Sequence, residues 1–224
     1  MGLERLTSIL QHKHSNYDTD VFVPIFEAIH AQVGCAPYAG KVGTEDDVQG
    51  HKDMAYRVIA DHIRTLCFAI ADGATPSNDG RGYVLRRILR RAVRYGMQTL
   101  GAERGFFSKL VAPLVVEYGE AFPELRNKKE EIEATLREEE ASFSTLLDSG
   151  IKYFSEHEVK LREAGLTVIS GEVAFYMYDS LGFPIDLTQI MATEKGMSMC
   201  VCLRLLCHVI LVFCAAYANP TIQL

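Results

Sequence analysis

The segment from Arg81 to Arg94 holds six arginines in fourteen positions and no acidic residue, in a chain whose net charge is −6. Arginine is the side chain best shaped to hold phosphate oxygens in pairs, because its N–H donors form a planar fork. At 100° per residue, five of the six share one arc of a helix, and apolar residues share the opposite arc. These five are Arg86, Arg87, Arg90, Arg91 and Arg94. The pattern predicts a helix with an apolar back and a guanidinium front ~12 Å long.

Two interpretations of this arginine stripe are open. Five like charges this close repel one another unless a polyanion neutralises them, which favours contact with a nucleic-acid backbone. Alternatively, the stripe is a solvated helix face over which acids from elsewhere in the chain fold. Charge is segregated along the chain, with nine acids and four bases between Glu117 and Glu140. A local basic stripe on an acidic body suits selective binding of one RNA or DNA element better than non-specific coating.

The elements that would carry these residues are mostly helices. Apolar residues at helical spacing predict helices over residues 3–11, 21–33, 53–71, 106–118, 128–147 and 185–195. The glycine-rich stretch 34–52 is predicted to be a loop, and the turn 72–80 leads into the arginine helix. His62 belongs to an apolar helical series, and no second His or Cys lies at ligand spacing, so we expect a core histidine. Period-2 alternation is scarce, and the predicted fold class is mainly α.

Length and cysteine usage set the broad class. At 224 residues the chain is long enough for one large domain or two small ones. The opening residues show no apolar segment typical of a signal peptide, so we expect a cytosolic or organellar protein with reduced thiols. Cys35 and Cys67 are isolated, whereas four cysteines crowd the last twenty-five residues.

The residues after Gly196 do not follow the helical pattern of the rest. The stretch 198–218 is apolar and cysteine-rich, and its length would allow a membrane helix. Cys200, Cys202, Cys207 and His208 match no closed zinc framework, so no metal site is expected there.

Three ordered segments resemble alanyl-tRNA synthetase: Ala55–Thr65, Arg81–Arg94 and Tyr178–Thr188. The opening Met-Gly-Leu-Glu-Arg-Leu is similar to the end of motif 3 of class II synthetases. The resemblance covers residues 1–196. It implies a helical tRNA-recognition domain over residues 16–196. A short remnant of the catalytic domain would precede it at 1–15, and a divergent tail would follow at 197–224.

The resemblance also implies an activity, the ATP-dependent attachment of alanine to tRNA-Ala. By the family's motif 3, Gly2 and Arg5 would bind ATP, which brings Mg²⁺ with it. An always-charged guanidinium there offsets charge that develops on phosphate. From the residues alone, Glu4 and Arg5 would be an ordinary surface pair. No catalytic residue is expected in this chain.

The family identifies its tRNA by a G·U wobble pair in the acceptor stem, and the matching residues are Asn78 and Asp179. The displaced guanine amine of that pair is a donor in the shallow minor groove. A carboxylate only accepts hydrogen bonds, and an amide both donates and accepts. The other tRNA contacts would come from Arg81 and the five arginines of the stripe. Without the resemblance, Asn78 is a turn residue and Asp179 a helix cap.

The chain also departs from the family pattern. Motifs 1 and 2 do not precede Met1, and the editing domain with its zinc site does not follow. We therefore expect an incomplete or mis-spliced product, inactive in adenylation by itself, with no zinc and a cytoplasmic or alternatively mitochondrial location. Two other functions are open: a non-catalytic binding module for acceptor stems, and an RNA binder tethered to a membrane through residues 197–224. The membrane alternative is the less favoured.

Overall fold

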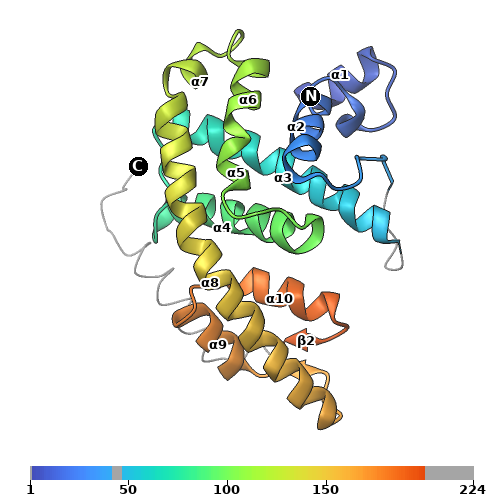
Figure 1. The fold of residues 1–224 in the computed structure, drawn as a ribbon, viewed down its shortest axis with the longest axis vertical. Helices are drawn as coiled ribbons and strands as arrows, with labels where there is room; N and C mark the ends of the chain where they lie inside the picture. The colour runs from blue at the N-terminus through green and yellow to red at the C-terminus, as the bar shows by residue number, and fades with distance from the viewer. Residues whose placement is uncertain (1, 42–46, 200–224) are drawn as a thin grey trace, which may run out of the picture. The chain divides into compact units, whose positions relative to one another are not determined.

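A computed structural model describes residues 2–41 and 47–199 of the chain. These residues are mainly helical, which confirms the predicted fold class. They divide into unit 1 (Met1–Ser144) and unit 2 (Thr145–Leu224). The long helix α8 (Lys129–Glu163), yellow to orange in Figure 1, begins in unit 1 and ends in unit 2. The predicted domain bounds 1–15, 16–196 and 197–224 stay predictions.

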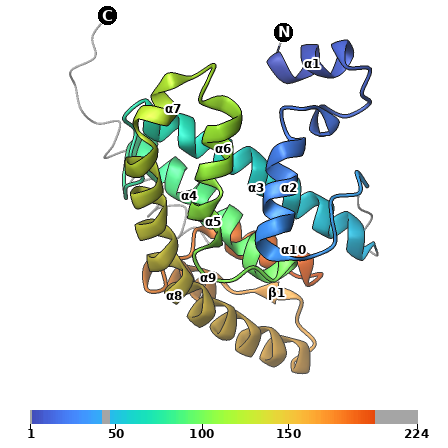
Figure 2. The ribbon, with the colours of Figure 1, turned by 45° about the horizontal axis from the view of Figure 1, so that its top comes forward.

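Unit 1 is built around one long central helix, α3 (Val48–Ala71). The other elements of this unit before α8 are α1 (Leu3–Leu10), η1 (Asn16–Asp18), α2 (Val23–Val33), α4 (Gly80–Tyr95), η2 (Gly96–Leu100), α5 (Phe106–Lys109), α6 (Val111–Tyr118) and α7 (Pro123–Asn127). Helix α3 packs most extensively against α4, and also contacts α2, α6 and α7 (Figure 2). Its buried side chains, among them Tyr56, Ile59 and Ile63, recur at helical spacing and supply the core.

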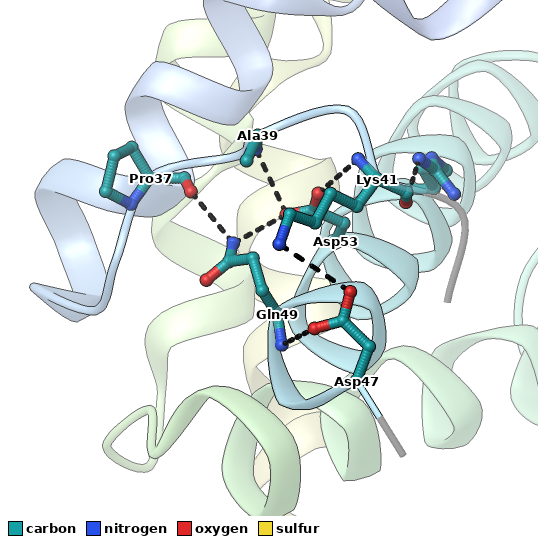
Figure 3. Close-up of polar contacts among 7 residues, drawn as sticks. Pro37, Ala39, Lys41, Asp47, Gln49 and Asp53 are labelled. Atoms are coloured by element: carbon teal, nitrogen blue, oxygen red, sulfur yellow. Dashed lines mark hydrogen bonds and ion pairs between the residues drawn. The ribbon is translucent and has the colours of Figure 1, made fainter. Parts of the chain in front are cut away.

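Helix α3 begins at Val48, before the predicted start at Asp53, because two aspartates stabilise its first turns. Asp47 is the N-cap, and its carboxylate accepts from the backbone N–H of Gln49 at 3.0 Å. Asp53 is fully buried and accepts from the backbone N–H groups of Ala39 and Lys41 (Figure 3). The carboxylate thus fastens the preceding loop to α3, a role that apolar periodicity does not reveal.

Helix α1 is attached to unit 1 by its polar side. Its apolar residues are exposed, with Leu3 at 61% and Ile9 at 65% of the full residue surface. Glu4 forms an ion pair with Arg64 of α3 at 3.2 Å. The Arg64 guanidinium also lies over the Phe22 ring, 4.7 Å from its centroid. Glu4 therefore pairs with a distant arginine, whereas the sequence suggested a pair with its neighbour Arg5.

In the described part of unit 2, residues 145–199, the structure shows the end of α8, two short strands and two helices. Strands β1 (Val168–Ile169) and β2 (Ser198–Met199) pair in parallel, with Val168 opposite Ser198. Helices α9 (Gly171–Asp179) and α10 (Ile185–Glu194) pack against each other over a core that includes Met177, Phe183 and Leu187.

Helix α8 extends to Glu163, well beyond the predicted end at Leu147. A glycine inside a helix ordinarily costs about 1 kcal/mol relative to alanine. At Gly150, however, a Cβ would overlap the ring of Phe183, so the glycine makes room for this fully buried aromatic side chain. That packing fixes the turn between α9 and α10 against α8.

Candidate nucleic-acid interface

Asn78 lies in the bend just before α4, and its side chain is exposed. The bend passes directly over the first turn of α4, where a Cβ on Gly82 would overlap the Ser77 hydroxyl and the Thr75 carbonyl. The Ser77 hydroxyl donates to the Asp79 carbonyl at 2.9 Å. Gly82 therefore lets the bend approach the helix closely, and this places Asn78 beside the arginines of α4.

The side chain of Asn78 is held by a chain of hydrogen bonds. The Arg86 guanidinium donates to the Asn78 carbonyl oxygen, Oδ1. Two further donors of Arg86 bind the Glu139 carboxylate of α8, with Nε at 3.0 Å from Oε2 and Nη2 at 2.6 Å from Oε1. The side chains of Arg86 and Glu139 are only 18% and 19% exposed. An acid from a distant helix therefore covers Arg86, as the second interpretation of the stripe had it.

The arginines of α4 do not form one exposed front, which corrects the simple helical-wheel expectation. Arg94 is 5% exposed, and its Nε donates to the Gln98 side chain at 2.6 Å. Arg90 is half-buried, with its guanidinium 5.3 Å from the Phe143 ring centroid, and burial lowers its pKa. Arg81 is exposed, while Arg87 and Arg91 are half-buried. The reason is that α4 packs between other helices, so its far arc is partly covered as well.

Asp179 is the last residue of α9, and its side chain is exposed. It does not cap α10, whose N-cap is Pro184. Within the part of the chain that the structure describes, its carboxylate has no hydrogen bond or ion pair. A negative charge at a helix C-terminus is unfavourable by about 0.3–1 kcal/mol. Asp179 thus offers an unengaged acceptor at a position where it does not help the helix.

Asn78 belongs to unit 1 and Asp179 to unit 2. Asn78 lies on a bend that the Gly82 contact fixes, whereas Asp179 ends α9, just before the turn that the contact of Gly150 with Phe183 fixes. Their predicted common role stays a prediction.

Gly2 and Arg5 lie at the start of α1. Gly2 is the N-cap, with extended backbone at φ −77° and ψ 148°. The Arg5 side chain is exposed, and among residues 2–41 and 47–199 it has no hydrogen-bond or ion-pair partner. Its neighbour Glu4 is engaged by Arg64, and a hydrogen bond from its own backbone together with Arg64 lowers the pKa of that carboxyl.

Two kinds of site receive no support from the described residues. These residues hold no cluster of three or more His, Cys, Asp or Glu side chains that would bind a metal ion. No helix among them is long and apolar enough to cross a membrane. Residues 200–224, which carry the cysteine-rich tail and its alternative membrane role, lie outside the described residues.

Sequence reasoning missed two residues that shape this interface. Glu139 is one of nine acids between Glu117 and Glu140, and Gly82 lies inside the Arg81–Arg94 segment, but the sequence pattern assigned a role to neither. Gly82 carries a partial signal, because it lies near the start of a segment that otherwise favours a helix. A glycine there lowers helix stability, so it indicates a close packing contact. Nothing local marks Glu139, because its partner lies 53 residues away along the chain.

The model of the family of class II tRNA synthetases (A) matches residues 1–201. This chain belongs to that family. Cytoplasmic alanine–tRNA ligase of Dictyostelium discoideum is 59% identical over 197 residues, which is 88% of this chain and 20% of that protein. The cytoplasmic enzyme of Drosophila melanogaster is 53% identical over 199 residues, 89% of this chain and 20% of that protein.

A bacterial relative, alanine–tRNA ligase of Chlorobium phaeobacteroides, is 48% identical over 88% of this chain and 21% of its own length. The resemblance to alanyl-tRNA synthetase is thereby confirmed. The chain spans about a fifth of the length of these relatives.

Proposed function

We propose that this chain is part of an alanine–tRNA ligase, in which residues 16–196 recognise the acceptor stem of tRNA-Ala. The observation that carries the proposal is the identity of 48–59% with such enzymes over nearly nine tenths of the chain. The cytoplasmic names of two relatives favour a cytoplasmic location over a mitochondrial one.

In the complete protein, Gly2 and Arg5 would take part in binding ATP. The exposed Arg5 guanidinium supports this role, because its donors are not engaged by other described residues and suit a phosphate. ATP carries Mg²⁺, and we assign no ligand for that ion to this chain, since its described residues hold no suitable cluster.

Asn78 and Asp179 would read the G·U wobble pair. Asp179 is a pure acceptor, exposed at a helix end where a carboxylate serves a ligand better than it serves the fold. Asn78 supplies an amide on a turn held close to α4. Arg81, Arg87 and Arg91 would hold the phosphate backbone, which positions the RNA without reading its sequence.

The test compares two acceptor-stem minihelices that differ only in carrying G·U or G·C at one position. We define wobble discrimination as the ratio of their dissociation constants. Asp179→Ala removes a charged acceptor worth about 1.5–3 kcal/mol, so discrimination should fall roughly 10- to 150-fold while binding stays measurable. Asn78→Ala should also lose most of the preference.

Glu172→Ala, which removes another exposed acid from α9, and Asn127→Ala, at an exposed asparagine of unit 1, are the matched controls. Both should leave discrimination unchanged. A thermal melt of each variant separates local unfolding from lost recognition. Folded Asp179→Ala and Asn78→Ala variants that still prefer G·U as strongly as the parent would exclude these two residues as the readers.

A further inference from the structure

We propose that Arg86 and Glu139 are positioning residues that turn Asn78 into a hydrogen-bond donor toward the RNA. Asn78 would then read an acceptor atom on the minor-groove side of the wobble pair, and Asp179 would take the guanine amine. The inference rests on the proposed function, because it specifies how one of the two readers works.

The orientation of the Asn78 amide follows from the chemistry of its neighbour. Arginine has only donors, so the group of Asn78 that faces Arg86 must be its carbonyl oxygen. The NH₂ group therefore points away from Arg86. Asn78 is exposed, and no described residue accepts a hydrogen bond from this NH₂ group. Two donors are thus left for a ligand.

Glu139 keeps Arg86 in the required position. Its carboxylate receives two parallel hydrogen bonds from the guanidinium, the geometry with the strongest orientational preference for this pair. Both side chains are more than four-fifths covered, so water competes less for them than at an exposed ion pair. Three elements are joined in this way: α8 through Glu139, α4 through Arg86 and the preceding bend through Asn78.

This arrangement changes the expected role of Arg86 itself. Its charge is offset by Glu139, and three of its five N–H donors are engaged by Glu139 and Asn78, so it is poorly placed to hold a phosphate. The minor-groove edges of base pairs offer acceptors such as the O2 atom of a pyrimidine, which suit an NH₂ group. Asn78 would therefore supply donors to such an acceptor atom.

Asn78→Asp separates this inference from a general need for a polar residue. The aspartate keeps an oxygen for Arg86 but replaces the NH₂ group with a second acceptor. We expect wobble discrimination to fall about tenfold, as much as for Asn78→Ala. If Asn78 instead used its carbonyl to take the guanine amine, Asn78→Asp would keep or raise the discrimination, which would overturn the proposal.

Substitutions in the ion pair of Arg86 and Glu139 test whether the pair positions Asn78 or only stabilises the fold. Glu139→Gln should lower discrimination severalfold, whereas Glu138→Gln, at the exposed neighbouring acid of α8, should not. The double change Arg86→Glu with Glu139→Arg restores an ion pair but presents an acceptor to Asn78, so the amide turns round. We expect this variant to regain thermal stability relative to Glu139→Gln and to remain poor in discrimination. Full recovery of discrimination would show that the pair is merely structural.

The salt dependence of binding provides a second readout. Arg86→Gln should leave the log–log salt slope unchanged, whereas loss of a phosphate contact reduces it by about 0.9 on the B-DNA scale. A reduced slope would return Arg86 to the backbone contacts and count against the inference. Failure of the proposed function is distinguishable, because in that case the unmodified chain itself would show no preference for G·U.

Discussion

At the scale of single residues, His62 shows how burial and a neighbouring charge act on one side chain. It lies on α3 with Arg91 of the arginine helix nearby. Burial, and to a smaller extent the charge of Arg91, lowers the pKa of His62 from 6.5 to about 4. The ring is therefore neutral in the folded chain at physiological pH. A neutral ring beside Arg91 also avoids adding a further positive charge to the six arginines of α4.

The shift predicts a loss of stability in mild acid. Above pH 6.5 the ring is neutral in both the folded and the unfolded chain. Between pH 6.5 and about 4 the unfolded chain binds a proton that the folded chain does not, so the free energy of unfolding falls by up to ~3 kcal/mol. Urea unfolding of the parent, His62→Gln and His62→Leu at several pH values measures this contribution.

The two substitutions differ in packing and share the loss of the ionisable ring. Relative to either variant, the parent should therefore lose stability on acidification with the same profile. Parallel pH profiles for all three proteins would mean that His62 titrates alike in the folded and unfolded chain.

At the scale of elements, the arginines of α4 differ in solvent exposure, although a helical wheel places most of them on the same face. Arg81 lies at the exposed first turn, whereas Arg94 is 5% exposed in the last turn, where it contacts Gln98 and the Tyr95 ring. A cation near a helix C-terminus is also favoured by the helix dipole. The two ends of the same helix thus differ in exposure: Arg81 would contact RNA under the proposed function, whereas Arg94 packs inside unit 1.

A matched pair of substitutions tests this division. Arg81→Gln should lower the log–log salt slope of RNA binding by about 0.9 and leave the melting temperature unchanged. Arg94→Gln removes a buried charge that has partners, so it should lower the free energy of unfolding by roughly 1–3 kcal/mol and leave the slope unchanged. The opposite assignment of effects would mean that the exposed and buried ends of α4 exchange roles when RNA binds.

At the scale of the whole molecule, the proposed function assigns charge and recognition to different groups. The chain carries a net charge of −6, so attraction for RNA would depend on a few local arginines. Sequence preference, by contrast, would come from the hydrogen bonds of Asn78 and Asp179. These two terms respond differently to salt.

We therefore expect affinity and wobble discrimination to separate when salt is varied. With three phosphate contacts, from Arg81, Arg87 and Arg91, raising monovalent salt from about 50 to about 200 mM should weaken binding of both minihelices about 40-fold. Discrimination should change less than about twofold, because the hydrogen bonds to the base pair release no counterions. The test is to measure the dissociation constants of both minihelices at several salt concentrations across this range. A discrimination that falls in step with affinity would mean that the preference for G·U is electrostatic.

The sequence alone determined the fold class, most helices and the family. Apolar residues at helical spacing are a local signal, so α2, α4 and α10 were predicted close to their observed bounds. The ordered segments around Asn78 and Asp179 were enough to identify a class II synthetase resembling alanyl-tRNA synthetase.

Only the tertiary structure decided which arginines face solvent and which acid covers Arg86. The extension of α8 past Gly150 and the early start of α3 also depend on contacts with distant residues, Phe183 in one case and the loop held by Asp53 in the other. The physical reason is that periodicity records which side of a helix is apolar, whereas burial and pairing depend on what packs against each side. Glu139 and Arg86 lie 53 residues apart, and only packing of α8 beside α4 brings their charges together.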